Sequence, residues 1–163
     1  MGQGSGFVIS ENLILTNHHV VGESKSVAIK FSNGLQLIGK VIASNSKSDV
    51  AIVKVDATLP KYFHLSKTTP TLGANVYAIG TPLDEKLHST ISRGTINALR
   101  MVKNQTLIQS NVNILSGNSG SPLLDKSGAV VGIAVSKYAA SKSSHSINLF
   151  IPIDDALKSL EKI

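Results

Sequence analysis

At 163 residues the sequence is long enough for one compact domain, or for two small barrels that share an interface. It contains no cysteine, which excludes a disulfide framework, thiolate catalysis and a cysteine-ligated zinc site. The formal charge is +6, but the basic residues are spread along the chain without interleaved aromatics. We therefore expect a solvated basic surface and no nucleic-acid partner, with a surface for an acidic substrate or partner as the alternative.

No stretch approaches the roughly 18 apolar residues that a membrane span needs, so we expect no membrane contact from this segment. Residues 1–6 lack the basic and apolar regions of a signal peptide. Two localisations stay open: an intracellular protein, or an exported protein whose upstream segment has been removed. Nothing in the sequence indicates an oligomeric state.

Short β-type segments separated by turn residues dominate the first half of the chain. One hairpin is predicted around Glu11-Asn12, and a second tight turn at Ser32-Asn33-Gly34. The expected strands cover residues 7–9, 13–15, 26–31, 35–43 and 50–55. Counted as about six strands, although only five segments are named, this half predicts a small closed barrel. Residues 56–74 are richer in Pro, Thr, Lys and Ser and are interpreted as a linker.

The second half repeats the pattern and ends differently. Further strands are predicted at 75–79, 88–98, 106–111, 121–124, 129–136 and 146–151. Only the end looks helical, with an N-cap and acidic residues at 152–155, followed by apolar residues at helical spacing. We therefore expect an all-β domain over residues 1–163. It would contain two six-stranded antiparallel barrels, at about 1–68 and 72–152, and a short helix at about 153–162.

The strongest local signal is the glycine-flanked segment 117–122, GNSGSP. A nucleophilic serine must project from a tight turn, with backbone N–H groups aimed at the developing oxyanion. Glycines on both sides of Ser119 permit the backbone angles of such a turn. The N–H groups of Gly117 and Ser119 are the natural donors. The alternative interpretation is an ordinary surface loop.

A serine nucleophile needs a histidine as its base, and the chain offers five: His18, His19, His64, His88 and His145. Residues 16–20 follow the apolar strand 13–15, which would fix a short loop against the barrel wall. A single histidine is more often structural or merely exposed. Because His18 and His19 are adjacent, they cannot easily aim at one site, so a metal centre is weakly supported and none is expected.

The third partner should be a buried carboxylate that orients the imidazole. Asp49 stands directly before the all-apolar strand that starts at Val50, where a carboxylate could lie against the core. The other aspartates considered are interpreted as turn or helix-capping residues: Asp56, Asp84, Asp125, Asp154 and Asp155. Read alone, Asp49 could equally be a satisfied acid at a strand start.

Together these segments resemble the trypsin-like serine proteases, and within them the HtrA (DegP/DegQ) branch. Residues 16–20 are similar to the family's T-N-x-H-V motif, 48–55 to its aspartate strand and 117–121 to its G-N-S-G-G motif. The order of the three motifs is the family's order. Weaker similarities lie at residues 4–9, 78–82, 92–96, 130–133 and 150–152.

The resemblance implies a chymotrypsin-type fold and a serine endopeptidase that cleaves polypeptides through an acyl-enzyme. It implies a triad of His19, Asp49 and Ser119, and an oxyanion hole formed by the N–H groups of Gly117 and Ser119, with that of Asn118 as a further donor. It requires no metal or organic cofactor. The substrate pocket would be lined by Asn113, Ile114, Leu115, Val135, Ser136, Lys137 and Asn148. None of these is acidic, so a small or medium uncharged side chain is the expected preference.

The sequence also departs from the family pattern. Ser121 replaces the second glycine of the serine motif, and Asn111 stands near the position of a usual aspartate. We expect a protease domain without the PDZ domain and the N-terminal trimerisation segment of the HtrA branch. Two other functions stay open: a latent or inactive protease fold used for binding, and an esterase that shares the nucleophile.

Overall fold

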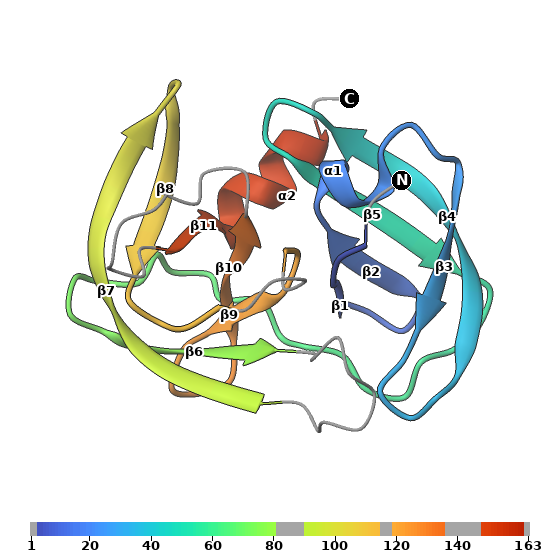
Figure 1. Ribbon diagram of the computed structural model, residues 1–163, viewed down its shortest axis with the longest axis horizontal. Helices are drawn as coiled ribbons and strands as arrows, with labels where there is room; N and C mark the ends of the chain where they lie inside the picture. Colours follow the sequence, from blue (N-terminus) through green and yellow to red (C-terminus); the bar gives the residue numbers. More distant parts are fainter. Residues whose placement is uncertain (1–2, 81–89, 115–118, 136–147, 162–163) are drawn as a thin grey trace.

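The computed structural model describes residues 3–80, 90–114, 119–135 and 148–161. Its strands form two antiparallel sheets, and a helix, α2 (Ile153–Glu161), lies between them (Figure 1). The all-β class, the arrangement in two sheets and the short C-terminal helix predicted from the sequence are confirmed. Expected elements within residues 81–89, 115–118 and 136–147 lie outside the described residues.

The first sheet has the strand order β1-β2-β5-β4-β3. Its strands are β1 (Phe7–Val8), β2 (Leu13–Thr16), β3 (Ser26–Lys30), β4 (Gln36–Asn45) and β5 (Val50–Val55). The hairpin predicted around Glu11-Asn12 is present as the pairing of β1 with β2. The expected count of six strands is wrong for this half, because five are found among the described residues. The segment 56–74 adds only an isolated bridge from Leu65 to Val130, so it supplies no sixth strand.

The second sheet closes into a six-stranded barrel, as predicted. Its order around the barrel is β10-β11-β8-β7-β6-β9. The strands are β6 (Asn75–Gly80), β7 (Thr90–Val102), β8 (Gln105–Ser110), β9 (Pro122–Leu124), β10 (Val130–Val135) and β11 (Asn148–Pro152). Strand β10 is buried along its whole length, which places the segment after the serine motif in the centre of the fold.

One hydrophobic core joins the two halves. Phe7, Leu15 and Val50 of the first sheet belong to the same buried cluster as residues of the barrel and of α2. The barrel and helix contribute Leu107, Leu124, Val130, Ile133, Val135, Ile151, Ile153, Ala156 and Leu160. Burial of each Val, Leu, Ile or Phe side chain among these contributes on the order of 1.5–3 kcal/mol. The shared core therefore fixes how the end of β2 and the start of β5 face the start of β9.

Helix α2 is amphipathic, and its buried face meets both halves. Ile153, Ala156 and Leu160 follow the helical period and are buried. Asp154 lies in the first turn, where a carboxylate complements the helix dipole, and its Oδ2 is 2.9 Å from Lys158 Nζ.

The polar side of α2 contacts the turn between β4 and β5. Asn45 Nδ2 donates to the Ser159 carbonyl over 3.0 Å, and the Ser48 hydroxyl donates to the Ser159 hydroxyl over 2.8 Å. Within that turn, Asn45 Oδ1 accepts hydrogen bonds from the N–H groups of Lys47 and Ser48. Helix α2 thus braces the residues immediately before Asp49.

A second helix, α1 (His18–Val21), was not expected, since the sequence suggested a loop at this point and a helix only at the end. It has four residues, too few to show a helical period, and it ends at Gly22, whose φ is 59°. Neither helix in the described part of the chain is long and apolar enough to cross a membrane.

Candidate active site

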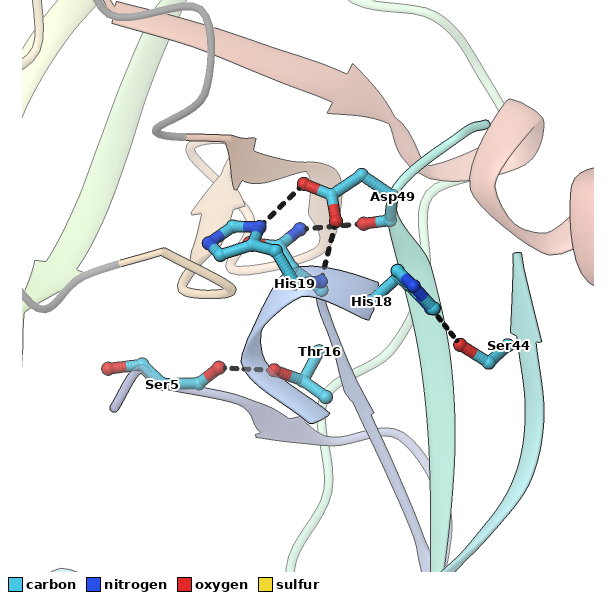
Figure 2. Close-up of polar contacts among 7 residues, drawn as sticks. Ser5, Thr16, His18, His19, Ser44 and Asp49 are labelled. Atoms are coloured by element: carbon cyan, nitrogen blue, oxygen red, sulfur yellow. Dashed lines mark hydrogen bonds and ion pairs between the residues drawn. The ribbon is translucent and has the colours of Figure 1, made fainter. Parts of the chain in front are cut away.

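Asp49 lies in the turn between β4 and β5 with its side chain buried. It is 2% exposed and has φ 60°, a left-handed conformation that aspartate tolerates better than most residues. Its carbonyl oxygen accepts a hydrogen bond of 2.9 Å from Asn17 Nδ2. This backbone geometry turns the carboxylate away from the start of β5 and toward helix α1 (Figure 2).

The carboxylate of Asp49 holds His19 at two points (Figure 2). Its Oδ1 accepts a hydrogen bond of 2.8 Å from the His19 backbone N–H, and its Oδ2 is 2.7 Å from His19 Nδ1. An ionised carboxylate can only accept, so Nδ1 carries the proton of that contact. The other ring nitrogen, Nε2, is then left as a potential base on a side chain that is 37% exposed.

His18 points in a different direction, toward β4 (Figure 2). Its Nδ1 lies 2.6 Å from the Ser44 hydroxyl, and its Nε2 lies 3.8 Å from a carboxylate oxygen of the exposed Glu23. The two adjacent histidines therefore do not converge. Among the described residues, no group of three His, Cys, Asp or Glu side chains is arranged to hold a metal ion.

Ser119 is 8% exposed and lies beside the histidine segment. The Ser5 N–H donates a hydrogen bond of 2.8 Å to the Ser119 carbonyl. The Ser5 carbonyl accepts a hydrogen bond of 2.7 Å from the hydroxyl of Thr16, just before helix α1 (Figure 2). A Cβ on Gly4 would lie 3.1 Å from the Ser119 carbonyl oxygen and 2.5 Å from Val20 Cγ2. The backbone of residues 4–5 thus fills the space between the serine turn and α1.

The serine turn is also fixed to the barrel. Gly120 N–H donates to the Ala134 carbonyl over 3.1 Å, and Ala134 N–H donates to the Ser121 carbonyl over 2.9 Å. Gly120 has φ 92°, and a Cβ there would collide with the Ser5 carbonyl oxygen. Only glycine fits at this point. The side chain of Ser121, the departure from the family's glycine, is accommodated in a buried position.

Replacing Gly120 with alanine should therefore lower both stability and activity. The positive φ alone costs about 1–3 kcal/mol, and relief of the clash requires the segment around Ser5 to move. Gly128→Ala is the matched control, because Gly128 has φ 86° and open space around its Cα. Chemical denaturation of both variants should show the larger loss for Gly120→Ala. Equal losses would mean that the contact with Ser5 contributes nothing.

The predicted oxyanion and pocket residues are only partly within the described structure. Gly117, Asn118, Leu115, Ser136 and Lys137 lie outside it. Four described pocket residues remain. Asn113 is exposed, Ile114 is half-buried and packs against the barrel core, and Val135 is buried at the end of β10. The fourth, Asn148, uses its side-chain amide to donate to the Val112 carbonyl over 2.6 Å.

The hydrogen bond from Asn148 to the Val112 carbonyl gives Asn148 a structural role that the sequence did not indicate. It ties β11 to the segment that leads into the serine motif. A second asparagine in this region, Asn111, accepts a hydrogen bond of 2.9 Å from the Thr95 N–H through its side-chain oxygen. The oxygen of an aspartate could accept the same bond, so the departure at Asn111 preserves the acceptor.

Three contributors to the site were missed in the sequence: Ser5, Thr16 and Asn17. Thr16 and Asn17 belong to the histidine motif, but their partners, Ser5 and Asp49, are distant along the chain, with a separation of 32 residues for Asn17 and Asp49. The only indication in the sequence was the polar character of Thr16 and Asn17. A threonine and an asparagine that directly follow a buried strand are expected to need hydrogen-bond partners.

The structure has two antiparallel β-sheets, with a paired histidine and aspartate beside strands of one and a glycine-flanked serine before β9 of the other. This combination defines a chymotrypsin-type peptidase domain. The family model described as "Trypsin-like peptidase domain" matches residues 4–133. The chain belongs to this family.

Relatives from several organisms agree with that assignment. A "Probable periplasmic serine endoprotease DegP-like" from Hahella chejuensis is 36% identical over 98% of this chain and 35% of its own length. "Protease Do-like 1, chloroplastic" from Arabidopsis thaliana is 32% identical over 94% of this chain and 37% of its own length. The chain therefore spans about a third of the length of these relatives.

The fold is also similar to a solved structure. The serine endoprotease from Yersinia pestis superposes with a TM-score of 0.81 and 31% sequence identity, covering 98% of this chain and 56% of that one. The family match, the relatives and this structure support the predicted resemblance to DegP-like serine endoproteases.

Proposed function

We propose that this chain is a serine endopeptidase with His19, Asp49 and Ser119 as its catalytic triad. The observation that carries the proposal is the two-point contact of Asp49 with His19, next to a serine turn tied to the same segment through Ser5. The assignment to a peptidase family supports the reaction. We further propose one peptidase domain over residues 1–163, with the two halves meeting at about 68–72.

In the proposed reaction, the Ser119 hydroxyl attacks a peptide carbonyl while His19 Nε2 takes its proton. Asp49 keeps the proton of the imidazole on Nδ1 and stabilises the imidazolium that forms. His19 then gives its proton to the leaving amine, which departs and leaves an acyl-enzyme. Water, deprotonated by the same nitrogen, hydrolyses this ester and restores the serine.

The negative oxygen of the tetrahedral intermediates needs donors that are already in place. We propose the N–H groups of Gly117 and Ser119 for this task, with that of Asn118 as a further donor. The two hydrogen bonds between the serine turn and Ala134 support a rigid Ser119. Rigid donors lower the barrier because they need no reorganisation during the reaction.

A serine-directed phosphonate probe tests the proposal. The purified protein is incubated with the probe and mapped by mass spectrometry, and in parallel it is offered an unfolded protein and a matched pair of ester and amide substrates. We expect the label on Ser119 and cleavage of peptide bonds. Ester hydrolysis without amide hydrolysis would establish the esterase alternative, and a folded protein without label or turnover would establish the binding module.

We also propose that the enzyme cleaves after small or medium uncharged residues such as Val, Ala, Leu or Thr. Trypsin-type pockets hold Lys or Arg with a buried acid, and the proposed pocket contains none. Burying an unpaired cation against Ile114 and Val135 would cost several kcal/mol. Lys137 adds like charge, and Asn148 in place of a glycine shortens the pocket, which disfavours Phe and Tyr.

The fragments from the unfolded protein measure this preference directly. Their ends, identified by mass spectrometry, should follow uncharged residues of the sizes above. Cleavage mainly after Lys or Arg would contradict the pocket assignment and leave the triad untouched.

A further inference from the structure

Asp49 requires support for its backbone as well as for its carboxylate. With φ 60° it adopts a left-handed conformation that is unfavourable for a residue with a side chain, and it is buried at the edge of β5. Such conformations persist only where neighbouring groups hold them. If the main chain at Asp49 relaxed, the carboxylate would turn away from His19. A neighbouring group must therefore hold this backbone in place.

Asn17 is the residue that contacts it. Its side chain is fully buried, and its Nδ2 donates to the Asp49 carbonyl over 2.9 Å. Asn17 occupies the N-cap position of α1, where asparagine normally accepts a hydrogen bond from the helix, but here its side chain makes no such bond. The amide is used for Asp49 instead of for the helix that it precedes.

The oxygen of the same amide group has no such partner in the described part of the chain. Asn17 Oδ1 is buried and has no hydrogen-bond partner among the described residues. An unsatisfied buried acceptor is unfavourable. The fold therefore gains nothing from the oxygen, and the contribution of Asn17 lies in its Nδ2 donor.

We propose that Asn17 is a positioning residue that holds Asp49 in the orientation in which its carboxylate contacts His19. Residues 17–19 then form three hydrogen bonds with Asp49: Asn17 Nδ2 with the carbonyl, His19 N–H with Oδ1 and His19 Nδ1 with Oδ2. The bond from Asn17 fixes the main chain of Asp49, and this orients the carboxylate for its two bonds with His19. This inference rests on the triad proposed above.

Asn17→Leu is the sharpest test, because leucine has nearly the shape of asparagine and removes both the donor and the orphaned acceptor. The fold loses one hydrogen bond and one unsatisfied oxygen, so we expect a small change in stability. We expect kcat to fall by about 10- to 100-fold, by analogy with the loss seen when the partners that orient metal-ligating side chains are removed. KM should change little, because the hydrogen bond of the Asn17 side chain in the described structure goes to Asp49 and not to a pocket residue.

Ser44→Ala is the matched control. It removes a hydrogen bond of 2.6 Å to His18, in the same short helix, but touches neither Asp49 nor His19. This variant should keep the wild-type kcat. Asn17→Ala serves as a second variant should leucine prevent folding, since it removes the same donor without adding volume.

Proton NMR provides a readout that a purely structural role would not move. The proton shared by His19 Nδ1 and a carboxylate at 2.7 Å should resonate well downfield of the amide protons. We expect this signal in the wild type and in Ser44→Ala, and its loss or upfield shift in folded Asn17 variants. Folded Asn17 variants with unchanged signal and kcat would overturn the inference.

The NMR comparison does not need turnover, which separates the two proposals. A wild-type protein with the downfield signal but no peptidase activity would overturn the proposed function. In that case the signal in the Asn17 variants would still decide whether Asn17 positions Asp49.

Discussion

Replacing Ser119 with alanine is expected to remove nearly all peptide-bond hydrolysis and to leave the fold intact. For a triad nucleophile the loss is on the order of 10⁶-fold in kcat. The fold should survive because the serine turn is anchored through backbone atoms, namely the Ser119 carbonyl to Ser5 and the Gly120 N–H to Ala134. Alanine retains all of these. Steady-state kinetics on a peptide substrate, with the unfolding temperature measured alongside, checks both parts.

Ser121→Ala is the control for that experiment. Ser121 lies in the same segment and is buried at 4% exposure, but it has no role in the proposed reaction. It should retain most of the activity. If Ser119→Ala stayed within tenfold of the wild type, the assignment of the nucleophile would be wrong.

His19→Ala should be about as damaging as loss of the serine, whereas His18→Ala should keep most of the activity. The two residues are neighbours, yet only His19 contacts the Asp49 carboxylate. The ring of His18 contacts Ser44 and Glu23 instead. In known triads the serine and the histidine act as one unit, so removing either costs a similar factor, about 10⁶-fold.

Both histidine variants should be assayed with one substrate and checked for folding by circular dichroism. His18→Ala loses a hydrogen bond of 2.6 Å and should be slightly less stable. Equal loss of activity in two folded variants would contradict the assignment of His19 alone.

The sequence predicted the site at the level of motifs because each motif is local. The apolar strand 13–15 precedes the histidines, and the all-apolar segment 50–55 follows Asp49, so the sequence alone places both at strand ends. The contact between His19 and Asp49 was implied by the family resemblance. The left-handed backbone of Asp49 was not, because a non-glycine residue with positive φ has no signal in one sequence.

Features that depend on distant partners could not be predicted. Helix α1 is a single turn, and the residue before it, Asn17, bonds to Asp49, so its existence depends on tertiary contacts and not on periodicity. The bond from Ser5 to Ser119 joins segments that are far apart in the chain and involves backbone atoms that any residue carries. The five segments predicted as strands in the first half are the five strands found, so the count of about six had no further segment behind it.

The hydrogen bonds between α2 and the turn before Asp49 can form only late in biosynthesis. Asn45 and Ser48 find their partner, Ser159, 114 and 111 residues later in the chain. At about 5–20 residues per second, a ribosome needs roughly 5–20 s to supply that partner after the turn has been made. Throughout this interval the nascent polypeptide carries His19 and Asp49 without the helix that supports the turn before Asp49. The support of the proposed triad is therefore completed only once the segment that forms α2 has left the ribosome.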